Sequence, residues 1–218
     1  VIQYEDDTRI NILRQDIGGK GYASGFEGLV KYIAGLLPAK DEIESPLRKE
    51  KTMYPIVAIR ELIANALIHQ DLSITGAGPT IEIFRSRIEI INPGTPLVNI
   101  NRIIDNPPRS RNEIMASLMR RLGICEELGT GWDRVVASCE AYLLPAPQID
   151  IYEENTKVSV FGPVSYKNMT QETRLWTCYL HVCLKYVNQE KATNSSLRAR
   201  LGLASTAAAS VSRLINLA

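Results

Sequence analysis

The sequence predicts an α/β protein of the two-layer α+β kind, in which helices cover one face of a mixed sheet and a small helical domain follows. Two observations predict this class. Short strand-like runs alternate with long helical patterns up to Gly162-Pro163, and only helical patterns follow that dipeptide. A length of 218 residues suits one large domain and one small one. We therefore expect domains at residues 1–163 and 164–218.

The order of elements comes from hydrophobic periodicity and from turn residues. Residues 1–22 are charged and end in a Gly-rich turn, and Ser24 is a candidate cap for the first helix, which reaches Leu36. A charged segment follows at 39–54, for which we expect an exposed connection or a short arm. The remaining expected elements of the large domain are a helix at 56–69, strands at 81–84 and 88–91, helices at 113–122 and 132–142, and a hairpin at 148–152 and 157–161.

The helix at 56–69 carries the strongest chemical signal. Its apolar residues recur at helical spacing and predict one buried stripe, whereas Glu61, Asn65 and His69 are spaced four apart and share another face. An Asn oxygen is a hard ligand suited to Mg²⁺, and a Glu one turn earlier could orient or deprotonate a water. The alternative is a half-exposed helix with ordinary polar residues.

The spacing Glu61-x-x-x-Asn65-Ala resembles the N-box of the GHKL ATPases. The wider run from Arg60 to Asp71 resembles a narrower group, bacterial transcriptional regulators whose GHKL-like domain is similar to the C-terminal region of RecG helicases. The resemblance implies that ATP and Mg²⁺ bind here, with Asn65 as the metal ligand and Glu61 as the catalytic residue. It also implies a DNA-binding domain of the Schlafen/AlbA type upstream of Val1.

A second signal is Gly129-Thr130-Gly131 at the start of a helix. Glycines there let backbone N–H groups approach an anion, and the helix dipole favours negative charge. A tight turn without a ligand is the alternative. In the GHKL pattern Asn92 stands where the adenine-reading Asp is usual, and an Asn can both accept and donate a hydrogen bond. The nucleotide-binding residues that we expect are Asn65, Asn92, Gly94, Gly129, Thr130 and Gly131.

The end of the chain is basic. From Ser165 onward seven basic and two acidic residues give a net charge of +5, against −4 for the rest. Helices are expected at 172–187 and at 193–202, with Thr193 or Asn194 as the cap of the second, and a third helix is expected from a Ser205 cap onward. Taking Gly202 as the turn of a helix-turn-helix exposes the candidate DNA-binding residues Ser205, Thr206, Ser210 and Arg213.

This tail resembles the winged helix of the same regulators, which implies duplex DNA as a partner. A helical packing or dimerisation unit, or a solvated charged face, is the alternative. For the whole chain we expect a DNA-binding transcriptional regulator. There are two competing hypotheses. One is a Mg-dependent ATPase whose hydrolysis drives a conformational cycle, and the other is a dimerisation scaffold with a non-functional nucleotide pocket.

Composition limits the remaining classes. The sequence contains no run of about 18 apolar residues, so it predicts no membrane span. Four cysteines without a Cys-x-x-Cys pair, together with only two histidines, disfavour a zinc site. Reduced thiols suit a cytoplasmic protein, and we expect a homo-oligomer there.

Overall fold

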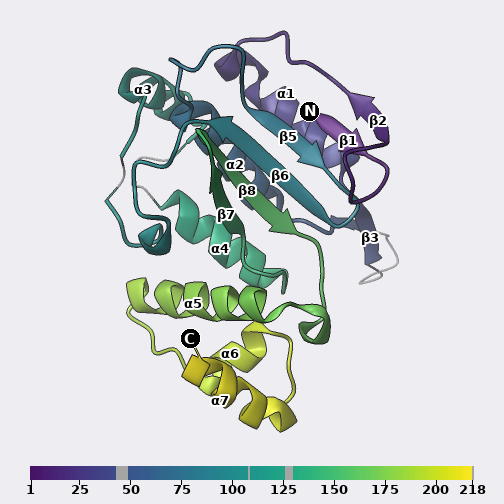
Figure 1. The fold of residues 1–218 in the computed structure, drawn as a ribbon, viewed down its shortest axis with the longest axis vertical. Helices are drawn as coiled ribbons and strands as arrows, with labels where there is room; N and C mark the ends of the chain where they lie inside the picture. Colours follow the sequence, from purple (N-terminus) through teal and green to yellow (C-terminus); the bar gives the residue numbers. More distant parts are fainter. Residues whose placement is uncertain (43–48, 108, 126–129, 218) are drawn as a thin grey trace.

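The computed structural model describes residues 1–42, 49–107, 109–125 and 130–217. These residues build a six-stranded sheet in the order β2-β1-β5-β6-β8-β7, with helices packed on one of its faces (Figure 1). β1 pairs parallel with β5 and every other pairing is antiparallel, so the sheet is mixed. The strands are β1 (Ile2–Tyr4), β2 (Ile12–Gln15), β5 (Thr80–Ile83), β6 (Arg87–Pro93), β7 (Gln148–Tyr152) and β8 (Asn155–Phe161). The predicted fold class is confirmed, although residues 1–22 form two strands that were not predicted.

Alternation along the central strands decides which face the helices cover. Ile83 of β5, Ile88 of β6 and Val160 of β8 lie in one cross-strand row and belong to the hydrophobic core. On the opposite face Glu82 pairs directly with Glu89. Arg9 resolves this repulsion, since its Nη2 atom lies 2.6 Å from a carboxylate oxygen of each. The segment between β1 and β2 is therefore tied to the helix-free face.

The helical layer is built around α2 (Ile56–His69). It packs on β6, on α1 (Tyr22–Leu36) and on α4 (Gly131–Ala141). Because neighbours surround it, burial extends beyond the single predicted stripe to Ala58, Ala64 and Ile68. α3 (Glu113–Arg121) lies at the far end of this layer and ends at Gly123, which has a φ of +68°.

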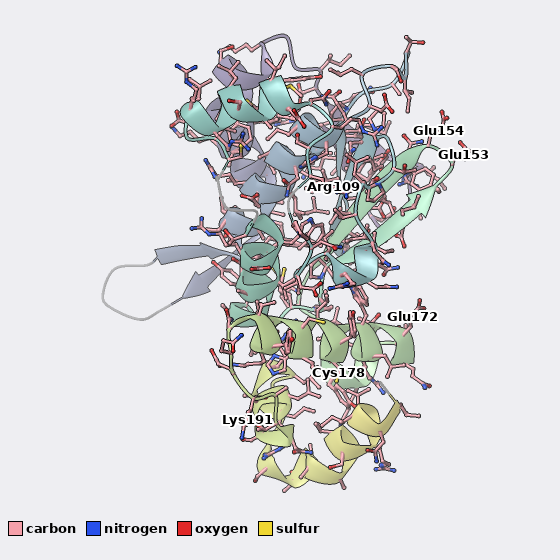
Figure 2. The ribbon with its side chains drawn as sticks, turned by 90° about the vertical axis from the view of Figure 1, so that its left-hand side faces the viewer. Arg109, Glu153, Glu154, Glu172, Cys178 and Lys191 are labelled. Atoms are coloured by element: carbon pink, nitrogen blue, oxygen red, sulfur yellow. The ribbon has the colours of Figure 1, made fainter. Side chains whose placement is uncertain are left out.

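Two local predictions for this half need correction. Ser24 does not cap α1: the helix starts after Gly21, and the Ser24 hydroxyl donates to the Gly21 carbonyl from inside the first turn. The exposed connection or short arm expected at 39–54 contains two strands that were not predicted, since β3 (Ala39–Glu42) and β4 (Lys49–Thr52) pair as an antiparallel hairpin. This hairpin projects away from the body of the protein (Figure 2).

The last part of the chain is helical, with α5 (Gln171–Val187), α6 (Asn194–Arg200) and α7 (Ala208–Leu217). Thr193 caps α6 through a capping box with Ser196, as predicted. Ser205 does not cap the third helix, because residues Ser205–Ala207 form a 3-10 turn (η3) before α7. Gly202 between α6 and η3 has a φ of +62°. A separate core holds these helices together and contains Met169, Cys178, Leu197, Leu201, Val211 and Leu214.

A buried polar cluster joins α4 to these helices. Nδ1 of His181 lies 3.0 Å from Glu140 Oε1, and its Nε2 lies 3.0 Å from the Ser196 hydroxyl. Nε of Arg200 lies 3.2 Å from the same Glu140 oxygen, as an ion pair without good hydrogen-bond alignment, and its Nη2 donates to the Leu144 carbonyl at 2.7 Å. None of the helices in the described residues is both long and apolar enough to cross a membrane.

Glu140→Ala should destabilise the protein. Arg200 is only 5% exposed, so removing its counter-ion leaves a buried charge, and we expect a loss of about 3 kcal/mol in the free energy of unfolding. Urea denaturation measures this loss. Glu172→Ala, at the exposed start of α5, is the control and should change the free energy by less than about 0.5 kcal/mol. Equal effects would show that the cluster contributes nothing.

Candidate nucleotide pocket

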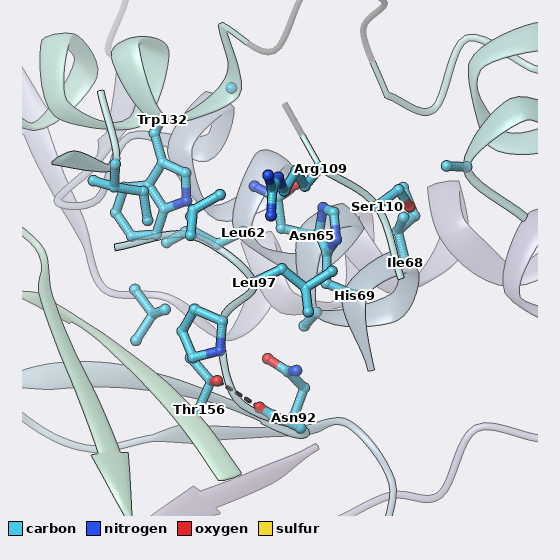
Figure 3. Close-up of a pocket in the computed structure, with 18 of the residues that line it drawn as sticks. Leu62, Asn65, Ile68, His69, Asn92, Leu97, Arg109, Ser110, Trp132 and Thr156 are labelled. Carbon is cyan, nitrogen blue, oxygen red and sulfur yellow. Dashed lines mark hydrogen bonds between the residues drawn. The ribbon is translucent and has the colours of Figure 1, made fainter. Parts of the chain in front are cut away.

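One cavity of about 460 Å³ opens between α2, the end of β6, the start of α4 and the segment that follows β6 (Figure 3). We call residues 95–107 and 109–112 the pocket segment; it includes the short turn η1 (Ile100–Arg102). Apolar side chains and polar groups both line the cavity, and in small-molecule sites polar groups that converge on the ligand fix its orientation. Its polar lining consists of Glu61, Asn65, His69, Asn92, Thr95, Asn106, Arg109, Ser110, Glu113, Arg120 and Thr156.

The α2 wall presents Glu61 and Asn65, one helical turn apart. Glu61 is only 6% exposed, because the first residue of α4 lies directly over its carboxylate. A Cβ atom added to Gly131 would lie 2.2 Å from Glu61 Oε1. Glycine at this position therefore lets the N-terminus of α4 approach the carboxylate.

The floor of the pocket comes from the ends of two strands. Asn92 is 8% exposed and its Nδ2 donates to the Pro93 carbonyl at 3.2 Å, which leaves its side-chain oxygen as the acceptor. Gly94 has a φ of +103°, and a Cβ there would lie 3.0 Å from Asp71 Cβ, so only glycine fits without strain. The Thr156 hydroxyl donates to the Gly94 carbonyl at 2.6 Å and joins β8 to this turn.

The two ends of the pocket segment are fastened to the C-terminal end of α2. Arg111 Nη1 lies 2.5 Å from Asp71 Oδ2, and its Nη2 donates to the Thr95 carbonyl at 2.7 Å. The Asn112 amide donates to the carbonyls of Ile68 and Gln70, each at 2.8 Å. These bonds satisfy carbonyls that the end of a helix leaves unpaired.

Two groups in the pocket have unusual surroundings. Burial, helped by the positive charge of Arg111, lowers the pKa of His69 below its ordinary value, so the imidazole is neutral at pH 7. The Ser110 hydroxyl is buried and has no hydrogen-bond partner among the described residues. A buried polar atom left in this state is suited to a hydrogen bond with a bound molecule.

The structure brings together five of the predicted nucleotide-site residues, namely Glu61, Asn65, Asn92, Gly94 and Gly131. Thr130 stands beside this group as the residue before α4, and Gly129 lies outside the described residues. The four residues proposed for DNA lie at η3 and α7, where Ser205, Thr206 and Arg213 are exposed and Ser210 is half-buried. All of these assigned roles stay predictions.

Sequence reasoning missed Arg109, Ser110 and Trp132 as pocket residues. Arg109 and Ser110 belong to a Pro-rich stretch without periodicity, so no pattern indicated where they would point. Trp132 follows Gly131 directly, and an aromatic residue beside a helix-start glycine was an available signal. The described residues contain no group of three or more His, Cys, Asp or Glu side chains that could hold a metal ion.

Comparison with known protein families finds one match within the chain. Residues 76–160 match the model described as "Putative ATP-dependent DNA helicase recG C-terminal". The matched stretch runs from before β5 to β8 and so includes Asn92, Gly94 and Gly131. Glu61 and Asn65 precede it.

A crystal structure of the DIP2311 protein from Corynebacterium diphtheriae has a similar fold, with a TM-score of 0.65 and 18% sequence identity. The alignment covers 97% of this chain and 46% of that one, so this chain spans less than half the length of that protein. At this identity the likeness concerns the fold. A search of curated proteins found no match.

Gly131→Ala should displace the Glu61 carboxylate, because the added methyl group would overlap it. We expect a loss of about 1–3 kcal/mol in the free energy of unfolding, as for other overpacked sites. Gly28→Ala in α1 is the control, since an added Cβ there meets nothing within 4 Å; it should stabilise the helix by up to about 1 kcal/mol. Thermal denaturation distinguishes the two. A Gly131→Ala protein as stable as the control would mean that Glu61 is not held against α4.

Proposed function

We propose that this chain is part of a DNA-binding regulator whose GHKL-like pocket binds ATP with Mg²⁺. The observation that carries the nucleotide part is the convergence of Glu61 and Asn65 with the glycine start of α4 in one pocket. The family match over residues 76–160 supports the same reading, since it contains the pocket residues outside α2.

The residues present fit a magnesium nucleotide. A cavity of about 460 Å³ lies within the range for small-molecule and cofactor sites. Mg²⁺ usually keeps several waters and takes one or two protein oxygens together with substrate phosphates. The Asn65 oxygen would be that ligand, and Glu61 would orient a water beside it. The phosphates would lie near Arg109, which points into the pocket beside Asn65 (Figure 3). The buried Ser110 hydroxyl would gain a partner.

Asn92 supports adenine as the base. An adenine amino group donates a hydrogen bond, and the Asn92 side chain, held through Nδ2 by the Pro93 carbonyl, offers an oxygen to accept it. His69, neutral because its pKa is lowered, adds no charge near the base.

Asn65→Ala should weaken binding of Mg-ATP about 10-fold or more, the cost of losing a bond to a charged group. Isothermal titration calorimetry with and without Mg²⁺ measures this. Asn168→Ala is the control, an exposed asparagine that does not line the pocket, and it should bind as the unmodified chain does. Absence of nucleotide binding by the unmodified chain would favour a scaffold with a non-functional pocket.

Glu61→Ala addresses the second hypothesis, a Mg-dependent ATPase, and should spare binding while removing any turnover.

We also propose that residues 164–218 form the DNA-binding domain and residues 1–163 the nucleotide domain. Ser210 and Arg213 are three residues apart in α7 and so lie on one side of it, and Thr206 lies in η3 just before this helix. Arg213 and Thr206 are exposed, so that side is available to a partner. Hydroxyls and one Arg suit base edges and phosphates in a major groove. Homo-oligomer formation stays a prediction.

Arg213→Ala should weaken binding to duplex DNA and reduce its salt dependence. Losing one phosphate contact makes the negative slope of log affinity against log salt less steep by about one unit. Fluorescence anisotropy with labelled duplex across a salt series measures the slope. Arg121→Ala, an exposed arginine at the end of α3, removes the same charge far from α7 and should leave the slope unchanged. Identical isotherms for Arg213→Ala and the unmodified chain would favour a packing unit.

A further inference from the structure

We propose that ligand binding in the pocket is coupled to the seating of α5 on the α/β layer, and through α5 to the packing of α6 and α7. This inference rests on the proposed nucleotide function of the pocket. It goes further by naming how the pocket would control the helical end of the chain.

The first observation is that two side chains of the pocket wall face the cavity on one side and α5 on the other. Ile103 of the pocket segment and Trp132 of α4 both line the cavity. The same two side chains pack against the apolar cluster between α4 and α5. No further layer separates a ligand in the pocket from that cluster. The α5 members of this cluster are Trp176, Tyr179, Leu180, Cys183, Leu184 and Val187.

The second observation is a polar tie at the same place. The Tyr179 hydroxyl of α5 donates a short hydrogen bond to the Asn101 carbonyl in η1. η1 runs directly into Ile103, so this bond joins α5 to the backbone of the pocket wall. A second aromatic residue of α5 also donates to a backbone carbonyl: Trp176 Nε1 bonds the Pro147 carbonyl at 2.9 Å. Pro147 does not line the pocket.

The opposite side of α5 belongs to the helical core. Cys178 lies on the side of α5 that faces α6 and α7 (Figure 2) and packs with Leu197 and Val211. His181 reaches the Ser196 hydroxyl of α6 at 3.0 Å. A change in the position of α5 on the pocket wall would therefore alter its contacts with both α6 and α7.

The direction of the coupling follows from the contacts. A ligand shifts a conformational equilibrium only by binding one state more tightly than the other. A nucleotide packed against Ile103 and Trp132 gains those contacts only when the wall is in place, and α5 holds the wall in place. Ligand binding should therefore stabilise the seated position of α5, and by linkage a seated α5 should strengthen ligand binding by the same factor.

Hydrogen–deuterium exchange of the whole chain tests this, with and without a saturating non-hydrolysable ATP analogue and Mg²⁺. We expect exchange in residues 171–187 to slow by about 5-fold or more on ligand binding, the lower range of known couplings. In Tyr179→Phe the ligand-dependent slowing should fall by at least about 2-fold, the lower end of the effect of one lost hydrogen bond. Tyr186→Phe is the matched control: Tyr186 lies on the same helix but is 73% exposed and outside the cluster, so the ligand-dependent slowing should equal that of the unmodified chain.

The possible failures are distinguishable when binding is titrated on the same samples. If the analogue binds but exchange in α5 is unchanged, the coupling is wrong and the nucleotide function stands. If Tyr179→Phe and Tyr186→Phe lose the response equally, the pocket wall is not the route and the proposal is also wrong. If the analogue does not bind, the proposed nucleotide function fails and the coupling fails with it.

Discussion

The enclosure of α2 is the constraint on which the rest of the structure depends. The helix lies between the sheet and two other helices, and Ala58, Ile59 and Ala64 are at most 1% exposed. Small side chains at Ala58 and Ala64 let the neighbouring elements approach closely. Most of α2 is covered in this way, and the pocket lies along the part of its surface that carries Glu61 and Asn65. Packing thereby fixes where Glu61 and Asn65 point.

The same enclosure gives the pocket its electrostatic character. A carboxylate as buried as Glu61 interacts strongly with nearby charges, because little water screens it. The N-terminus of α4 lies over it at Gly131, and the positive end of a helix dipole favours a carboxylate at that place. The rigid elements α2 and α4 thus set the chemistry of one wall, and the pocket segment supplies the opposite one.

The sequence predicts the parts of this arrangement that depend on local patterns. The periodicity of residues 56–69, the hairpin ending at Phe161 and the Thr193 cap all follow from short-range rules and agree with the structure. β1 and β2 were missed because pairing between distant residues creates them: Ile2 pairs with Glu82, and the β2 residues are exposed. The pocket wall was only half predicted for a related reason. Glu61 and Asn65 share a helix, whereas Ser110 reaches the site through irregular backbone that has no period to read.

The fastening of the pocket segment has a consequence for how such a protein could diversify. Arg111 joins Asp71 to the Thr95 carbonyl, and Asn112 donates to the carbonyls of Ile68 and Gln70. Both ends of the pocket segment are therefore held beside the end of α2, independently of the residues between them. The entropy of closing a loop grows only slowly with its length. Insertions or deletions in the parts of the segment away from Ile103 and Ile104, which pack against the core, would therefore cost little stability. The pocket segment could therefore change in evolution to suit different molecules, while the walls built by α2 and α4 stayed the same.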